Sequence, residues 1–220
     1  MKVDLRLYAL LDPQHRGRFS LEEIARRVVT GGATLLQLRD KTGSTRQVIE
    51  EARAIKDAVA GSRVPLLIND RVDIALAAGA DGVHVGQDDM SVADARKLLG
   101  ADSIIGLSIK TMEEARAAPV ELLDYACIGG VFATTSKDNP NPPIGVERLA
   151  VIASVLRDRA PRLAVGAIAG IDESNAESVM RSGVDGIAVI SALSMADDPA
   201  QAARRLRAIV DAGASSRKAR

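Results

Sequence analysis

The sequence is poor in the residues that build disulfides and aromatic cores. It contains one cysteine and no tryptophan, and aromatic residues make up 2% of the chain. The single cysteine, Cys127, excludes an internal disulfide and fits a reducing cytoplasm. It lies in the apolar run YACIGG, where a buried packing thiol is a better interpretation than a nucleophile. With 47% hydrophobic residues and so few rings, the core is expected to be aliphatic.

The chain also lacks an excess of charge of either sign. Lys plus Arg and Asp plus Glu both number 29, which gives a net charge of zero. This balance argues against a general binder of nucleic acid or membrane, although local clusters can still form an anion pocket. No segment resembles a signal peptide, and no apolar run is long enough to span a bilayer. We therefore expect a cytoplasmic protein with small-molecule partners, and the sequence leaves open whether it forms a homo-oligomer.

Short apolar runs alternate with helical patterns along the 220 residues. We expect strands at 5–11, 33–39, 65–69, 82–86, 103–108, 125–129, 162–168 and 186–190. We expect helices at 20–31, 44–60, 71–78, 91–99, 111–117, 145–159, 172–182 and 199–211. Ser20 with Glu23 and Thr111 with Glu114 predict capping boxes, and Asp172 and Ser91 predict N-caps.

Eight β-α units predict a single-domain α/β protein with a (β/α)8, or TIM, barrel over residues 1–213. An open doubly wound sheet is the alternative. The segment AAGADGVHVG (77–86) resembles RSGVDGIAVI (181–190), and the two fall four units apart, which favours the barrel. Residues 214–220 are basic and predicted to form a disordered tail. The longest loop, 131–145, follows a strand and is expected to be functional.

Polar residues end three successive predicted strands. They are Gln37, Arg39 and Lys41, then Asn69 and Asp70, then Gln87, Asp88 and Asp89. In a barrel these strand ends meet at one face, where an arginine can fork onto phosphate oxygens and a lysine adds a point charge. Two carboxylates from neighbouring strands suit Mg²⁺, with Asp70 as one ligand and Asp88 or Asp89 as the second. Alternatively, these acids cap the helices that follow.

A second group of candidate residues, most of them polar, follows the later strands. The group comprises Ser108 and Lys110, then Thr134, Thr135, Ser136 and Lys137, then Gly170, Ile190 and Ser191. Hydroxyls, backbone amides and a lysine in one loop suit a phosphate, and loops after the seventh and eighth strands of this fold often hold one. A second anion site is therefore expected. His84 is interpreted as a barrel-interior residue and His15 as an exposed loop residue.

Seven short motifs connect these residues to a known family. QLRDK, IND, HVGQDD, GLS, TTSK, AGI and VIS, in this order, resemble the thiamine-phosphate synthase family over essentially the whole chain. The resemblance implies a TIM-barrel transferase of thiamine biosynthesis with one Mg²⁺ per active site. Such an enzyme joins the diphosphate of 4-amino-5-hydroxymethyl-2-methylpyrimidine to 4-methyl-5-(2-phosphoethyl)thiazole. The products are thiamine monophosphate and pyrophosphate, formed through a carbocation-like step.

The resemblance also implies roles for individual residues. Asp70 and Asp89 would bind Mg²⁺, which selects Asp89 over Asp88. The pyrimidine diphosphate contacts would be Gln37, Leu38, Arg39, Asp40, Lys41, Asn69, Ser108 and Lys137. The thiazole phosphate contacts would be Thr134, Thr135, Ser136, Gly170, Ile190 and Ser191. Arg39, Lys41, Lys137 and Ser108 would act in catalysis.

The sequence departs from the usual family pattern at four positions. Gly130 and Ala133 lie in an altered IGGVFATTSK loop, Ala169 replaces a glycine, and Lys110 stands where members often have histidine. A related thiazole tautomerase depends on that histidine, so Lys110 argues against this alternative function. A catalytically silent phosphate-binding homologue is a second alternative. Such a protein is expected to lose the metal carboxylates, whereas Asp70 and Asp89 are both present.

Overall fold

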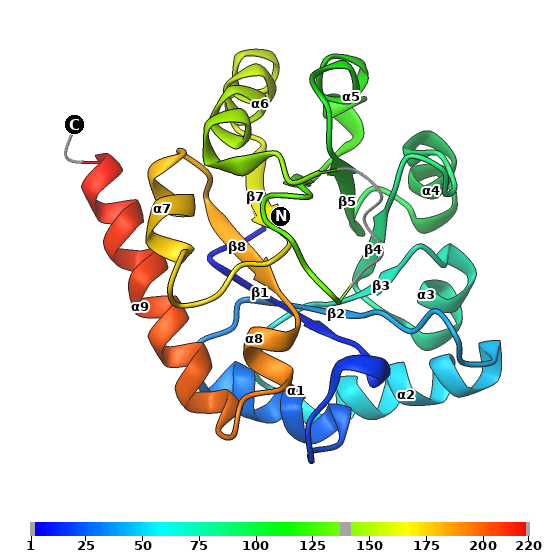
Figure 1. Cartoon of the computed structure of the whole chain (residues 1–220). Coiled ribbons are helices and arrows are strands. Elements are labelled where there is room, and N and C mark those ends of the chain that lie inside the picture. Colours follow the sequence, from blue (N-terminus) through cyan, green and yellow to red (C-terminus); the bar gives the residue numbers. More distant parts are fainter. Residues whose placement is uncertain (1–2, 137–141, 219–220) are drawn as a thin grey trace.

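A computed structural model describes residues 3–136 and 142–218, with side chains as far as residue 215. Eight parallel strands close into a barrel, and helices surround it (Figure 1). The strands are β1 (Leu7–Leu11), β2 (Leu35–Leu38), β3 (Leu66–Asn69), β4 (Gly82–Val85), β5 (Ile104–Ile109), β6 (Tyr125–Ile128), β7 (Ala164–Ile168) and β8 (Gly186–Val189). Because β1 pairs with β8, the predicted barrel is confirmed and an open sheet is excluded.

The helices follow the strands in the order that the sequence predicts. They are α1 (Leu21–Thr30), α2 (Thr45–Ala58), α3 (Val72–Ala78), α4 (Val92–Leu99), α5 (Met112–Ala117), α6 (Gly145–Arg159), α7 (Ala176–Arg181), α8 (Ser191–Ser194) and α9 (Pro199–Lys218). Two 3-10 helices, η1 (Pro13–His15) and η2 (Val120–Leu122), complete the described elements. η1, η2 and α8 were not predicted from the sequence, because segments this short carry no helical periodicity. No helix in the described ranges is long and apolar enough to cross a membrane.

Most predicted caps are confirmed, and one is wrong. Thr111 and Glu114 form a capping box, and Ser91 accepts a hydrogen bond from the Asp94 amide. Ser20 accepts a hydrogen bond from the Glu23 amide, but the Glu23 carboxylate binds Arg27 instead of completing the predicted capping box. The exception is Asp172, because α7 begins only at Ala176. The Asp172 side chain instead accepts a hydrogen bond from the Ser174 amide, in the turn that precedes α7.

The C-terminal helix is longer than the sequence predicts. Residues 214–218, expected in a disordered tail, continue α9 instead. This helix packs against α1 and α7 on the outside of the barrel (Figure 1). A Cβ on Gly213 would lie 2.6 Å from the Met180 Cβ, so the end of α9 is in close contact with α7. That tertiary contact supports a helix end that local sequence does not predict.

The core has two layers, because alternate residues of each strand face opposite sides of the sheet. The outer layer lies between strands and helices. The inner layer fills the barrel and comprises Val3, Leu5, Tyr8, Leu10, Leu35, Leu67, Ile104, Tyr125, Cys127 and Ala188. Cys127 is buried there, as predicted. Both tyrosines of the chain also lie inside, and Gly106 makes room for one of them, since a Cβ would lie 2.0 Å from Tyr125 Cζ.

Candidate functional site

A cavity of about 570 Å³ opens at the carboxyl ends of the strands. Its walls come from the ends of β1 to β5 and from the segments after β6, β7 and β8. Ten predicted site residues line it, namely Gln37, Arg39, Asn69, Ser108, Thr134, Thr135, Ser136, Gly170, Ile190 and Ser191. Lys137 lies outside the described residues. Because the carboxyl ends of the strands meet at one face of the barrel, two groups of predicted residues that are distant in sequence line one cavity.

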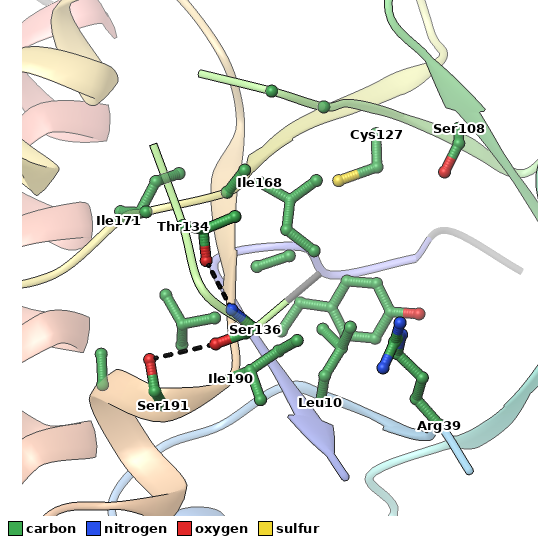
Figure 2. A pocket seen from close by; sticks show the side chains of 18 of the residues that line it. Leu10, Arg39, Ser108, Cys127, Thr134, Ser136, Ile168, Ile171, Ile190 and Ser191 are labelled. Atoms are coloured by element: carbon green, nitrogen blue, oxygen red, sulfur yellow. Dashed lines mark hydrogen bonds between the residues drawn. The ribbon is translucent and has the colours of Figure 1, made fainter. Parts of the chain in front are cut away.

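Hydroxyl groups gather at one end of the cavity. The Ser136 amide donates to Thr134 Oγ1 at 3.1 Å, and the Ser136 hydroxyl lies 3.5 Å from the Ser191 hydroxyl. Figure 2 shows Ser136 between Thr134 and Ser191, with Arg39 and Ser108 farther around the pocket. Ser191 is the first residue of α8. This arrangement of short polar side chains at the start of a helix suits a phosphate group.

The backbone at Ala169 and Gly170 shapes the same end. Gly170 has φ +64°, and a Cβ there would lie 2.4 Å from the Ala133 carbonyl oxygen. Ala169 has φ +96°, a conformation that favours glycine. The Phe132 amide donates to the Ala169 carbonyl at 3.1 Å, so the segment after β6 rests on the segment after β7. The departure from the family pattern at Ala169 therefore falls on a strained residue beside the hydroxyl cluster.

Arg39 lies at the other end of the cavity and is held by an acid that the sequence analysis did not single out. One Arg39 nitrogen donates to Asp12 Oδ2, and the Asp12 side chain is 2% exposed. Asp12 also caps η1 by accepting from the Gln14 amide at 2.9 Å. His15 Nδ1 lies 3.4 Å from the same carboxylate, and His15 is half-buried rather than exposed as expected. Asp12 directly follows β1, so its position at the end of a predicted strand could have identified it as a site residue.

A pair of carboxylates lies beside Lys41. Lys41 Nζ is 3.1 Å from Asp70 Oδ2, and Asp89 Oδ2 accepts the Gly86 amide at 2.7 Å. Burial raises the pKa of Asp89, and the adjacent Asp70 carboxylate raises it further, while the Gly86 amide opposes both. Asp70 also has φ +63°, which is unusual for a residue with a side chain. Asp89, rather than Asp88, therefore lies next to Asp70.

Two adjacent carboxylates need a neutralising partner, and their oxygens are hard ligands of the kind that Mg²⁺ takes. Within the described ranges, no three His, Cys, Asp or Glu side chains gather into a metal-binding group. Asp70 and Asp89 could thus hold a magnesium ion that draws its other ligands from water and phosphate oxygens. Neither acid caps a helix, because the N-caps of α3 and α4 are Arg71 and Ser91. The alternative role as helix caps is wrong.

Two predicted diphosphate contacts have structural roles in this fold. The Leu38 side chain is buried in the outer core, away from the cavity. The Asp40 carboxylate accepts the amides of Thr42 and Gly43 at 2.8 and 2.9 Å and so orders the loop after β2. Lys41 does not line the cavity and is oriented toward the carboxylate pair instead. Gln37 in β2 and Arg39, which directly follows β2, line the cavity.

Lys110 lines the cavity near the end of β5. Its backbone amide donates to Glu114 Oε2, which ties this residue to the capping box of α5. The segment that carries Lys110 is therefore anchored, although no part of the family pattern assigns the side chain a role.

His84 lies inside the barrel, as predicted, and belongs to a set of hydrogen-bonded polar side chains. Its Nδ1 lies 2.8 Å from the Tyr125 hydroxyl, and its Nε2 lies 2.9 Å from Ser108 Oγ. The Tyr125 and Tyr8 hydroxyls are 2.9 Å apart, and Gln37 Nε2 donates to Tyr8. Burial raises the pKa of both tyrosines, so both stay protonated at neutral pH. These contacts join Gln37 to Ser108 across the barrel.

Comparison with known proteins supports the resemblance. A family model described as thiamine monophosphate synthase matches residues 7–193. A thiamine-phosphate synthase from Agrobacterium fabrum is 49% identical, with 99% of each chain covered. One from Chloroflexus aurantiacus is 47% identical, with 94% of each covered. A solved thiamine phosphate pyrophosphorylase from Pyrococcus furiosus is 35% identical with a TM-score of 0.83, covering 96% of this chain and 98% of that one. The chain therefore belongs to the thiamine monophosphate synthase family.

Proposed function

We propose that this protein is a Mg²⁺-dependent thiamine-phosphate synthase. It transfers the 4-amino-2-methylpyrimidin-5-ylmethyl group from its diphosphate to the nitrogen of 4-methyl-5-(2-phosphoethyl)thiazole. Family membership supports the overall reaction. The observation that carries the proposal is a single cavity with a hydroxyl cluster at one end and Arg39 at the other, beside a carboxylate pair.

The first step breaks the bond between the methylene carbon and the diphosphate oxygen. The bonding electrons leave with pyrophosphate, and the aminopyrimidine ring shares the positive charge that remains. Arg39 and Lys41 stabilise the charge that builds on the departing oxygens, and Lys137 is proposed to assist them. A magnesium ion at Asp70 and Asp89 would supply further positive charge to the leaving group. Asp12 holds Arg39 in place for this contact.

The second step forms the carbon–nitrogen bond. The lone pair of the thiazole nitrogen attacks the methylene carbon, and no proton is lost at either atom. Because no proton is lost, the step needs no general base, which agrees with a cavity in which His84 is already bonded to Tyr125 and Ser108. Ser136, Ser191 and their neighbours bind the thiazole phosphate and orient the nitrogen toward the carbon. Holding the two reactants together in this way replaces a bimolecular encounter with a local one.

The natural partners are proposed to be these two phosphorylated small molecules, without nucleic acid or membrane. The proposed compartment is the cytoplasm, in which a single buried thiol needs no oxidising environment. Among the described residues, no contact at the site favours the tautomerase or the silent-homologue alternative.

The deciding experiment incubates the purified protein with both substrates and measures thiamine monophosphate and pyrophosphate. We expect equal amounts of both products with Mg²⁺ and loss of turnover with a chelator. Asp70→Ala should lower kcat/KM by at least about 100-fold while the protein stays folded. Asp73→Ala, which removes an exposed acid on the following helix, is the matched control. Absence of product while both substrates bind would refute the proposed function, and near-normal turnover of Asp70→Ala would refute the metal role.

A further inference from the structure

The carbonyl groups of Ala169 and Gly170, after β7, are each fixed by a hydrogen bond. The Phe132 amide donates to the Ala169 carbonyl at 3.1 Å, and Asn175 Nδ2 donates to the Gly170 carbonyl at 2.8 Å. A peptide group is planar and trans, so its N–H points opposite to its C=O. Fixing these two carbonyls therefore also fixes the directions of the Gly170 and Ile171 amides. Both of those residues line the cavity.

These two amides are available to a ligand. No residue that the structure describes accepts a hydrogen bond from the amide of Gly170 or Ile171. A Cβ on Gly170 would lie 2.4 Å from the Ala133 carbonyl oxygen, directly before Thr134 of the hydroxyl cluster. Ile171 and Thr134 lie on the same side of the pocket in Figure 2. The two N–H donors therefore belong to the end of the cavity where the hydroxyls gather, and a phosphate oxygen is a strong acceptor for such donors.

Asn175 occupies a position where asparagine usually has a different role. It is the N-cap residue of α7, yet its side chain forms no capping hydrogen bond. Its Oδ1 instead accepts the Asp172 amide at 3.0 Å, while its Nδ2 donates to the Gly170 carbonyl. An N–H needs an acceptor and a carbonyl needs a donor, so the two contacts together fix the orientation of the Asn175 side chain. This side chain bridges the turn 170–172 from outside the cavity.

The turn that Asn175 bridges needs such support, because the backbone before it is strained. Ala169 has φ +96°, a conformation that only glycine adopts easily. A strained segment keeps its conformation only while the surrounding contacts hold it there. Without the Asn175 side chain, the Gly170 carbonyl loses its donor and the peptide group can rotate. Rotation would turn the Ile171 amide to a new direction.

We propose that Asn175 is a positioning residue that directs the amides of Gly170 and Ile171 at the phosphate group of the thiazole substrate. It acts through the backbone and does not touch the ligand. The inference rests on the proposed function for the identity of that ligand. Its own content is that the turn 170–172 binds a phosphate monoester only while Asn175 holds it.

The kinetic test compares 4-methyl-5-(2-phosphoethyl)thiazole with the corresponding alcohol, 4-methyl-5-(2-hydroxyethyl)thiazole. Asn175→Ala should lower kcat/KM for the phosphate about 10-fold, mainly through KM. The value for the alcohol and the KM for the pyrimidine diphosphate should change by less than about 2-fold, because neither depends on the two amides. A general loss of structure would instead lower kcat/KM for the phosphate and the alcohol to the same extent.

Thr34→Val is the matched control. The Thr34 hydroxyl also accepts from one amide and donates to one carbonyl, both of Leu7, but at the amino end of the barrel. Both variants should lower the melting temperature, and only Asn175→Ala should reduce the preference for the phosphorylated thiazole. An unchanged preference in Asn175→Ala, or an equal loss in the control, would overturn the inference. If Asn175→Ala does not fold, Asn175→Ser, which retains one polar atom, replaces it with an expected loss of about 3-fold.

Binding measurements separate this inference from the proposed function. Addition of the phosphorylated thiazole to ¹⁵N-labelled wild-type protein should shift the Gly170 and Ile171 amide resonances, whereas the alcohol should not. Calorimetry should show about 10-fold weaker binding of the phosphate to Asn175→Ala. These results without any thiamine monophosphate would refute the proposed function alone. Product formation without the two amide shifts, or with equal affinity in Asn175→Ala, would overturn the inference alone.

Discussion

Arg39 is positioned by a neighbouring strand as well as by its own. Its guanidinium contacts Asp12, which follows β1, and the carboxylate is almost fully buried. An arginine held by one nitrogen keeps its other nitrogens for a phosphate, and its side-chain entropy is already reduced before the ligand binds. Asp12 does not line the cavity itself and therefore acts by orienting Arg39 at the end proposed to bind the diphosphate.

Asp12→Asn tests this role, because asparagine keeps the shape and loses the charge. We expect kcat/KM for the pyrimidine diphosphate to fall about 10-fold or more, mainly through KM, with a smaller effect on the thiazole phosphate. The free energy of unfolding should fall by about 2–4 kcal/mol, since Arg39 loses its buried counterion. Steady-state kinetics with each substrate varied, together with urea denaturation, measure both effects. Asp73→Asn is the control, and equal KM changes for the two substrates would contradict a role directed at Arg39.

Ala169 offers a second test at a single residue. Its φ of +96° strains any residue with a Cβ, whereas the next residue, Gly170, is glycine. Ala169→Gly should raise the free energy of unfolding by about 1 kcal/mol, because relief of strain exceeds the added entropy of the unfolded chain. Ala167→Gly in β7 is the matched control and should lower it, since the buried Ala167 gains nothing from glycine. Thermal and urea unfolding decide the matter, and destabilisation by Ala169→Gly would contradict the strain.

The residues of the cavity differ in how far sequence alone predicts them. Gln37, Ser108 and Ser191 were predicted because polar residues at the ends of buried runs face one end of any parallel barrel. Asp12 could have been found by the same rule, but its pairing with Arg39 could not. The partnership of Tyr8 and Tyr125 depends on barrel register between residues 117 positions apart, which no local pattern encodes.

At the scale of elements, α8 links the hydroxyl cluster to the loop after β1. Its last residue, Ser194, is fully buried, and its hydroxyl donates to the His15 and Ile190 carbonyls. The Gly17 amide donates to the Ser194 carbonyl at 3.0 Å. Ser191, at the other end of this single helical turn, lines the cavity. The orientation of α8 therefore depends on the same loop that contains Asp12.

Ser194→Ala removes the side-chain part of this link. We expect KM for the thiazole phosphate to rise about 3- to 10-fold with kcat nearly retained, and stability to fall by about 1 kcal/mol. Ser182→Ala removes a comparable hydroxyl-to-carbonyl bond at the end of α7 and is the matched control. It should lower stability to a similar extent and leave both KM values unchanged. A rise in KM for the pyrimidine diphosphate alone would contradict the assignment of α8 to the thiazole phosphate.

At the scale of the whole molecule, one contact recurs four times around the barrel. The residue before each even-numbered strand accepts the amide of a residue at the start of the preceding odd-numbered strand. The pairs are Thr34 with Leu7, Asp81 with Leu66, Asp124 with Ile105 and Asp185 with Val165, at 3.1, 2.8, 2.9 and 2.9 Å. In each pair the backbone amide of the first residue also donates to the carbonyl of the second. We call these contacts the strand clamps.

The strand clamps explain the internal repeat seen in the sequence. The similar segments 77–86 and 181–190 each contain a Gly-x-Asp-Gly step, and their aspartates, Asp81 and Asp185, are both clamp residues. The repeat predicted the barrel correctly, but the other two members of the fourfold pattern could not be recognised from sequence. Thr34 uses a hydroxyl in place of a carboxylate, and Asp124 is followed by Tyr125 rather than glycine. Hydrogen-bond geometry, not residue identity, is what the four quarters of the barrel share.

The clamps lie at the amino ends of the strands, opposite the cavity, so they should contribute to stability and not to catalysis. Asp124 accepts both the Ile105 amide and Arg96, the latter at 2.7 Å. Asp124→Ala should therefore lower the free energy of unfolding by about 2–3 kcal/mol, because a buried amide and a guanidinium lose their acceptor. The cost in Asp185→Ala should be similar, and the two should add, since they act on different strand pairs.

Urea denaturation measures these losses, and kinetics well below the melting temperature should show kcat and both KM values unchanged in each variant. Asp102→Ala, which removes an exposed carboxylate from the loop before β5, should change stability by less than about 0.5 kcal/mol. If Asp124→Ala altered either KM while the protein remained folded, the amino ends of the strands would be coupled to the cavity. The division between a stabilising end and a reactive end of the barrel would then fail for this protein.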